Sequence, residues 1–217
     1  MVWGEGSDIG EHLVGHPGVD MVSFTGSTAA GRRIAAVAGQ TIKRTAMELG
    51  GKSAAILLDD ADFNVAIAGV LDTCFVNSGQ SCTAHSRLIV PKSREQEAVR
   101  VARELAEQWT PGDPFDSTTK MGPLISHDHW SKVQGFITDA QALPHTQLVT
   151  GGAGKPEGLN AGYFVRPTVF AGVHPDDAIA RDEIFGPVLS IFSVEDEDSA
   201  VQLANDTVYG LSGGVWS

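Results

Sequence analysis

The chain of 217 residues contains 42% apolar and 19% charged side chains, a composition typical of globular proteins. Its 27 acidic residues outnumber the 15 lysines and arginines and give a formal net charge of −12, which argues against a nucleic-acid partner, because phosphates attract basic surfaces. No apolar run is long enough to cross a bilayer, and no signal-peptide pattern opens the chain. We therefore expect no membrane partner and a cytoplasmic location.

The first predicted elements form a strand–helix–strand unit. A strand over 19–24 ends in a Thr-Gly turn, and Ser27 or Thr28 then caps a helix that Gly39 stops. A second strand is predicted over 41–49 and ends at a pair of glycines.

The elements that follow alternate between strands and helices. They are a strand over 53–58, a helix capped by Asp62, a strand over 87–90, a helix over 93–109 opened by a Ser93/Gln96 capping box, a helix over 128–140, strands over 147–150, 164–170 and 188–192, a helix over 197–205 and a strand over 213–216. This order predicts an α/β fold, a mostly parallel sheet with flanking helices. The last strand is expected to lie at an open edge of the sheet.

Cys82 lies in a glycine-rich turn, Asn77-Ser78-Gly79-Gln80-Ser81-Cys82. An ionised thiol is a good nucleophile, and small neighbours let a planar electrophile approach it. The other cysteine, Cys74, lies on the apolar face of a predicted helix and is interpreted as an inert core residue. Two cysteines in a chain of this size do not make a disulfide scaffold, so we expect free thiols and a reducing compartment.

Two further features are ambiguous when taken alone. Glu48, in the turn Glu48-Leu49-Gly50-Gly51-Lys52, is either a base that takes a proton from a thiol or a water, or an exposed carboxylate at a strand end. Gly26 and Ser27 precede a helix, where free N–H groups bind phosphate, but a plain helix cap explains Ser27 equally well.

Five segments in a fixed order carry a resemblance to a known family. They are Phe24-Thr25-Gly26-Ser27-Thr28, Glu48-Leu49-Gly50-Gly51-Lys52, Asn77-Ser78-Gly79-Gln80-Ser81-Cys82, Gly162-Tyr163-Phe164-Val165-Arg166-Pro167-Thr168 and Glu183-Ile184-Phe185-Gly186-Pro187-Val188. Together these segments resemble the aldehyde dehydrogenase superfamily, and the resemblance runs from about Gly4 to Trp216. It implies an aldehyde dehydrogenase-like α/β fold.

The resemblance also implies a role for each candidate residue. Cys82 would attack an aldehyde carbonyl and form first a thiohemiacetal and then a thioester, with its own N–H holding the oxyanion. Glu48 would activate the water that releases the carboxylic acid. The cofactor, NAD or NADP, would be bound by Gly26 and Ser27 at its pyrophosphate, by Glu183 at its ribose hydroxyls, by Phe185 near its ring, and by Leu49.

By the same resemblance, residues 1–50 form the C-terminal part of a dinucleotide-binding domain, and residues 51–217 form an incomplete catalytic domain. We therefore expect a fragment truncated at both ends, whose parent enzyme is a homo-oligomer that oxidises a small aldehyde. The isolated chain is expected to have little dehydrogenase activity, because most of the nucleotide site would lie outside it.

Several alternatives stay open. The chain could be a cofactor-independent thiol esterase that uses Cys82 and Glu48, a non-catalytic fragment that pairs through its last strand, or an enzyme that passes its acyl group to coenzyme A. The identity of the aldehyde, and the choice between NAD and NADP, also stay open.

His85 departs from the small residue that is common in the family at this position. It activates the thiol, crowds the site or points away, and we favour the last. His127 and His129 diverge on a predicted helix, so no metal site is predicted.

Overall fold

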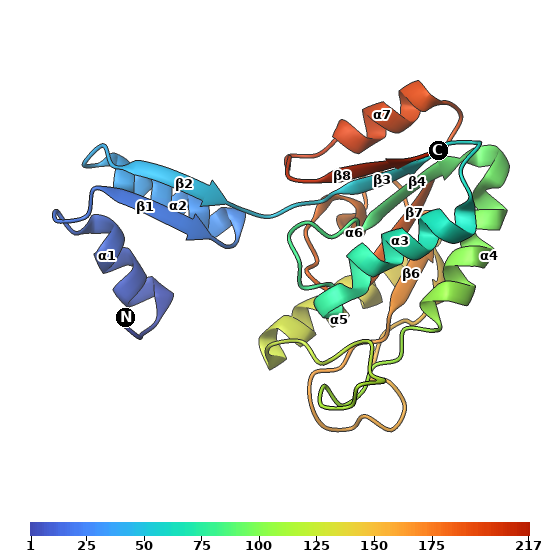
Figure 1. The fold of residues 1–217 in the computed structure, drawn as a ribbon, viewed down its shortest axis with the longest axis horizontal. Coiled ribbons are helices and arrows are strands. Elements are labelled where there is room, and N and C mark those ends of the chain that lie inside the picture. Colours follow the sequence, from blue (N-terminus) through green and yellow to red (C-terminus); the bar gives the residue numbers. More distant parts are fainter. The chain divides into compact units, whose positions relative to one another are not determined.

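The computed structural model describes residues 1–217, which form two units, Met1–Gly50 and Gly51–Ser217. Each unit has its own secondary structure (Figure 1). None of the helices is both long enough and apolar enough to span a bilayer.

The first unit is a parallel strand–helix–strand. It contains a π-helical turn (Gly6–Gly10), α1 (Glu11–Gly15), β1 (Met21–Thr25), α2 (Thr28–Gly39) and β2 (Arg44–Glu48). The two strands pair in parallel, with Thr25 opposite Glu48. Ser27 caps α2 as predicted, since its hydroxyl accepts the amide of Ala30 at 3.2 Å. The strand predicted over 41–49 starts later, because the chain turns at Ile42, whose φ is 57°. The helical residues before β1 were not predicted.

The second unit is built on a six-stranded sheet with the strand order β5-β6-β7-β4-β3-β8. Its strands are β3 (Ala54–Leu57), β4 (Arg87–Pro91), β5 (Gln147–Thr150), β6 (Thr168–Ala171), β7 (Val188–Val194) and β8 (Gly213–Trp216). All neighbouring pairs are parallel except β5 with β6. The predicted α/β class with a mostly parallel sheet is confirmed.

Helices cover both faces of this sheet. They are α3 (Phe63–Phe75), α4 (Glu95–Ala106), α5 (His127–Ala142), α6 (Ala178–Arg181) and α7 (Glu197–Asn205). Side chains alternate across each strand, so Ala55 and Leu57 pack with α3 and α4, while Ala54 and Ile56 join the core beneath α5, α6 and α7. Figure 1 shows α3 and α4 together on one face. Burial on both faces explains the unbroken apolar sequence of β3.

Two further predicted boundaries are wrong. The helix predicted over 93–109 is α4, which begins at Glu95 after a 3₁₀ turn and has no side-chain cap, so the Ser93/Gln96 capping box does not form. Arg94 instead donates to the carbonyls of Asp59 and Ala61 and ties this turn to the segment after β3. The strand predicted over 164–170 starts only at Thr168, since the preceding proline has no N–H to donate.

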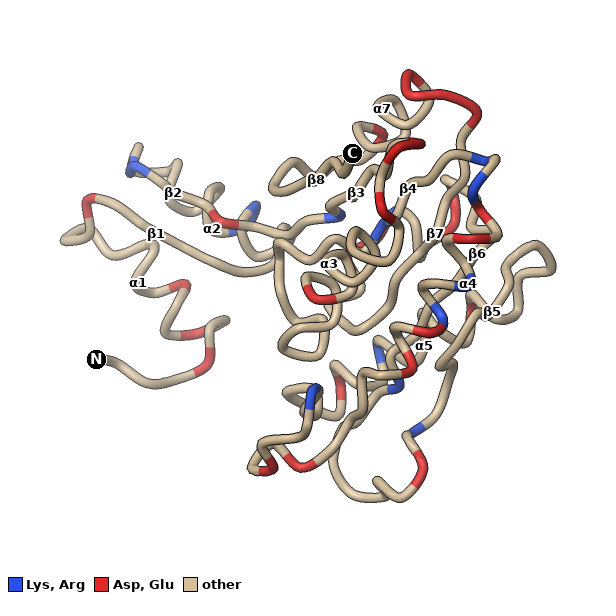
Figure 2. The backbone as a smooth tube through the Cα atoms, turned by 45° about the vertical axis from the view of Figure 1, so that its right-hand side comes forward, with Lys and Arg blue, Asp and Glu red and all other residues tan.

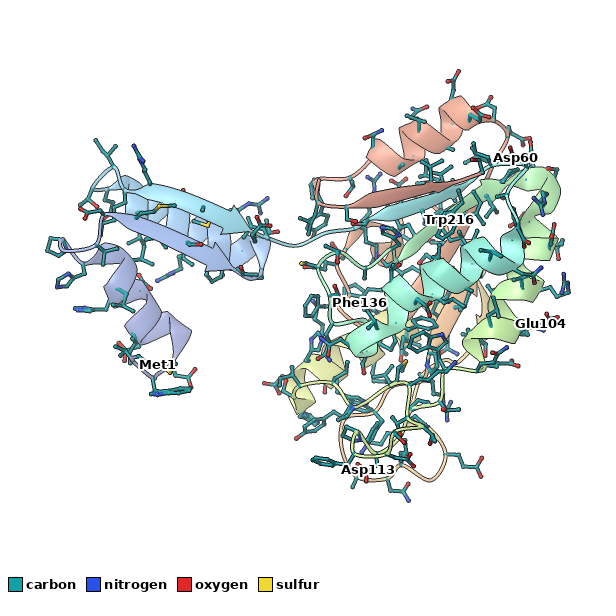
Figure 3. All side chains as sticks on the ribbon, in the orientation of Figure 1. Met1, Asp60, Glu104, Asp113, Phe136 and Trp216 are labelled. Atoms are coloured by element: carbon teal, nitrogen blue, oxygen red, sulfur yellow. The ribbon has the colours of Figure 1, made fainter.

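The last strand, β8, lies at an edge of the sheet as predicted and pairs only with β3. Trp216 lies at its end, beside α3 (Figure 3). A methyl group built on Gly69 of α3 would come within 2.6 Å of the Trp216 ring, so the small residue lets the indole pack against the helix.

Charges are interspersed in the second unit. Figure 2 shows both acidic and basic residues along α4, where Arg100 donates to Glu104 one turn on. Such surface pairs are screened by solvent and contribute little to stability.

Candidate active site

Four segments that are distant in sequence meet at one edge of the second unit's sheet. Gly51 precedes β3, Cys82 precedes β4, Glu183 and Phe185 precede β7, and Leu211 precedes β8. These strands are parallel, so the residues just before them lie at the same, amino-terminal edge. The topology therefore brings the motif-bearing turns of this unit together.

The turn that leads to Cys82 has an unusual backbone. Asn77, Ser78 and Gly79 have φ values of 52°, 58° and 73°, in the left-handed region that side chains disfavour. The Ser78 hydroxyl donates to the carbonyl of Gly122 at 2.8 Å. Gln80 and Asn77 each donate from the side chain to the other's carbonyl at 3.0 Å. These bonds hold the strained turn in one conformation.

Gln80 also fixes a second loop. Its Oε1 accepts the amide of Ile125 at 3.0 Å, just before α5. The polar residues of this motif are therefore used to shape and anchor the turn, and this leaves the thiol as its free reactive group.

The two cysteines lie in different environments. Cys82 is half-buried, and its amide donates to no acceptor, so that N–H is free to bind an oxyanion. Cys74 is fully buried in α3, as predicted, and its thiol contacts the carbonyl of Val188 at 3.6 Å. Burial raises the pKa of Cys74 to about 12, although the nearby Lys52 lowers it. Cys74 is therefore protonated and inert at neutral pH.

Gly51 connects the turn that leads to Cys82 with Glu183. Its amide donates to Oε1 of Glu183 at 3.1 Å. A methyl group built on Gly51 would overlap the carbonyl oxygen of Cys82 and would lie 3.5 Å from Cβ of Leu211. Only glycine at position 51 allows the Cys82 carbonyl and Leu211 to lie so close to its backbone.

The turn that contains Phe185 packs against the turn that leads to Cys82. Phe185 has a φ of 60°, and a methyl group built on Gly79 would overlap the carbonyl of Gly186. The two turns therefore share a glycine-to-glycine backbone contact.

Lys52 is buried next to this site. It is 2% exposed, and its Nζ has no hydrogen-bond partner. The pKa of Lys52 is lowered to about 7, chiefly by burial and also by Arg87, while Cys74, Asp182 and Glu183 oppose the shift. A buried amine of this kind is on the border between its charged and neutral forms near pH 7.

His85 is hydrogen-bonded to the segment before β8. Its Nε2 lies 3.2 Å from Oγ of Ser212, and its ring lies 3.1 Å from a methyl group built on Gly214. Burial lowers the pKa of His85, which favours the neutral ring. These contacts hold the His85 ring against the segment that leads into β8.

The candidate residues of the first unit lie around the start of α2. The amide of Gly26 donates to the carbonyl of Glu48 at 3.0 Å, so it is not free for a phosphate. The Leu49 side chain packs against α2 at Gly31, where a methyl group would come within 2.5 Å of Cδ2. Glu48 ends β2 as an exposed carboxylate without a hydrogen bond or ion pair.

Each unit, taken by itself, presents groups that suit part of a dinucleotide. The first turn of α2 has unpaired N–H groups and the positive end of the helix dipole, which suit a pyrophosphate. Glu183 uses one carboxylate oxygen for Gly51 and keeps Oε2 free to accept a ribose hydroxyl. No group of three or more His, Cys, Asp or Glu side chains is arranged to hold a metal ion.

Three residues at the site were missed in the sequence. Leu211 lies beside Gly51, and its place just before a parallel strand is the signal that could have found it. His129 and Lys132 of α5 donate to the carbonyls of Phe185 and Glu183, at 2.7 and 3.1 Å. Their spacing of three puts them on one helix face, but no local pattern shows what that face contacts.

A family model described as "Aldehyde dehydrogenase family" matches residues 1–217. The chain belongs to the aldehyde dehydrogenase family. It is 48% identical over 217 residues to a 3-succinoylsemialdehyde-pyridine dehydrogenase of Pseudomonas sp, covering 100% of this chain and 45% of that protein. It is 46% identical over 209 residues to the geranial dehydrogenase of Castellaniella defragrans, covering 96% of this chain and 43% of that protein.

Solved structures agree with this assignment. A mutant of aldehyde dehydrogenase C from Pseudomonas syringae, in complex with NAD+ and octanal, matches with a TM-score of 0.97 and 42% identity, over 100% of this chain and 44% of that chain. Betaine aldehyde dehydrogenase from Staphylococcus aureus, in complex with NAD+, matches with a TM-score of 0.95 and 37% identity, over 100% of this chain and 43% of that chain. The aldehyde dehydrogenase-like fold is confirmed, and the chain spans less than half the length of these relatives.

Proposed function

We propose that the protein oxidises an aldehyde to a carboxylic acid with NAD or NADP, through a covalent intermediate on Cys82. This proposal rests on the contacts of Gly51. Its amide donates a hydrogen bond to the Glu183 carboxylate, and its lack of a side chain leaves room for the Cys82 backbone. Gly51 thus lies against both the Cys82 backbone and the Glu183 carboxylate, which supports roles for these two residues in one site. Family membership and relatives solved with NAD+ support the choice of cofactor.

The first step is addition of the thiolate to the carbonyl carbon. The S–C bond forms while the carbonyl π electrons move to oxygen, and the free amide of Cys82 donates to that oxyanion. The left-handed backbone at Asn77 to Gly79 fixes the turn that leads to Cys82, which would reduce the ordering needed on the way to the transition state.

The second step oxidises the bound carbon. When bound, NAD(P) supplies the ring carbon that accepts a hydride from the thiohemiacetal. Collapse of the oxyanion then leaves a thioester on Cys82. Glu183, through its free Oε2, would hold the ribose hydroxyls and orient the cofactor, with Phe185 beside its ring.

The third step releases the acid. Glu48 would take a proton from a water, whose oxygen attacks the thioester carbon and expels the thiolate. Glu48 belongs to the first unit and Cys82 to the second, so this step requires the two units to act together.

Residues 1–50 are proposed to be the C-terminal part of the cofactor domain, with Gly26, Ser27 and Leu49 at the dinucleotide. Residues 51–217 are proposed to belong to the catalytic domain. Because the amide of Gly26 is already paired, the pyrophosphate would be held by the free amides after it.

The test is aldehyde-dependent reduction of NAD+ or NADP+ by the full-length protein, with octanal as one substrate. We expect Cys82→Ser to abolish the reaction, Cys74→Ala to retain it, and Glu48→Gln to slow turnover roughly a hundredfold. Reduction that persists in Cys82→Ser would refute the proposal. Nucleotide-independent ester hydrolysis without any cofactor reduction would favour a thiol esterase instead.

A further inference from the structure

Side chains on one face of α5 contact the turn that carries Glu183 and Phe185. His129 Nε2 lies 2.7 Å from the carbonyl oxygen of Phe185, and the two rings meet edge to face with centroids 5.9 Å apart. Lys132 donates from Nζ to the carbonyl of Glu183 at 3.1 Å. Val133 fills the space beside Gly186, where a methyl group would come within 2.8 Å of the valine.

These three α5 residues share one side of the helix. Residues three and four positions apart project in the same direction, which is the spacing of His129, Lys132 and Val133. Each contacts a different residue of the turn, so the turn is fixed at Glu183, Phe185 and Gly186 together. A single loss should loosen the turn without removing the helix.

The turn needs such a restraint because its backbone is strained. Phe185 has a φ of 60°, which its β-carbon disfavours, and strained residues persist only where their surroundings over-determine them. A carbonyl oxygen only accepts, so Nε2 of His129 carries a proton and donates. The bond fixes the orientation of the Phe185 peptide group.

We propose that His129 is a positioning residue: through the Phe185 carbonyl, with Lys132 beside it, it holds the turn so that the Glu183 carboxylate is ready to bind the cofactor ribose. The part of this inference that concerns cofactor binding rests on the proposed function, whereas the restraint of the turn by His129 does not. Relaxation of the turn would move Glu183 relative to Gly51 and would also disturb Gly79, which contacts Gly186.

The restraint is tested by hydrogen–deuterium exchange of the peptide that spans 183–190 in the full-length protein. We expect exchange about fivefold faster in His129→Ala, as for the loss of one hydrogen bond, and a smaller increase in Lys132→Met. His129→Gln, whose side-chain amide can donate to the same carbonyl, should restore slow exchange. His127→Ala is the matched control, because this exposed histidine on the same helix has no hydrogen bond to the turn. Unchanged exchange in His129→Ala would overturn the restraint.

The cofactor half is tested by steady-state kinetics on the same variants. His129→Ala should raise KM for the cofactor about fivefold with kcat within about twofold, and His129→Gln should recover the wild-type KM. An unchanged KM beside faster exchange would overturn the positioning role while leaving the restraint in place. If the wild-type protein reduces no cofactor, the proposed function fails and the positioning role with it, whereas the exchange experiment still decides whether His129 restrains the turn.

Discussion

The amide of Gly51 donates a 3.1 Å hydrogen bond to Oε1 of Glu183, although the two residues are 132 positions apart. The same glycine has no room for a side chain, because the carbonyl of Cys82 lies where its β-carbon would be. One small residue therefore sets the separation between the candidate nucleophile and the candidate ribose ligand.

Gly51→Ala should damage the site with little effect elsewhere. The added methyl group must push the Cys82 carbonyl away, and a shift of this size at a reacting centre should lower kcat/KM roughly tenfold or more. Gly135→Ala is the control, because this glycine of α5 has open space around it. It should keep full activity and be neutral or stabilising, as expected for alanine in a helix. Equal kcat/KM in Gly51→Ala and wild type would contradict this role.

The two thiols should differ sharply in reactivity. At pH 8, iodoacetamide should label Cys82 rapidly, whereas Cys74 should stay unlabelled because it is fully buried and has a pKa of about 12. Mass spectrometry of tryptic peptides measures both sites, and urea should expose Cys74 as an internal control. Comparable labelling of both thiols in the folded protein would show that Cys82 is not a distinct site.

Lys52 should make stability depend on pH. Burial lowers its native pKa to about 7 from the ordinary value of 10.5, so above pH 7 the unfolded state binds more protons than the native state. The free energy of unfolding should therefore rise between pH 7.5 and 8.5, at most by about 1.4 kcal/mol from this group. Above about pH 9 the raised pKa of Cys74 acts in the opposite direction, since the unfolded thiol ionises first.

Lys52→Met checks the source of this slope. Methionine keeps an unbranched chain but has no charge to bury, so urea unfolding should give a nearly flat response over the same pH range and a higher stability at pH 6.5. A slope equal to that of the wild type would assign the pH dependence to other groups.

Arg87 should be important for stability. It is 3% exposed and donates to the carbonyls of Lys52, Leu203 and Ala204 at 2.8, 2.9 and 2.8 Å, which ties α7 to the sheet. Arg87→Met removes all three hydrogen bonds and leaves the carbonyls of Lys52 and Ala204 without this donor, which should cost roughly 3 kcal/mol in urea unfolding. Arg100→Met removes only an exposed helix pair and should change stability little. Similar stabilities for both variants would show that the α7 connection is unimportant.

Much of the fold could be predicted because local signals were strong. The apolar run of β3 and the cap at Asp62 each specify their own element, and both occur where predicted. The start of α4 could not be predicted from the Ser93/Gln96 spacing, because Arg94 makes longer-range bonds to the carbonyls of Asp59 and Ala61. Tertiary contacts outweighed a local motif there.

The sequence indicates candidate reactive residues, but it does not indicate the contacts that support them. Cys82 lies in a turn whose composition is itself informative, whereas the bond from His129 to Phe185 joins residues 56 apart and leaves no local pattern. The pairing of the Gly26 amide with Glu48 was likewise hidden, because it depends on the register of β1 against β2. Strand order and register are the missing information.

The most direct test of the central claim is mass spectrometry of the Cys82 peptide after the full-length protein has been mixed with an aldehyde and NAD+ and quenched in acid. We expect the mass of the corresponding acyl group on Cys82, more abundant in Glu48→Gln because water attack on the thioester is slower. An unmodified Cys82 in both proteins, or an acyl group on another residue, would contradict covalent oxidation at this thiol.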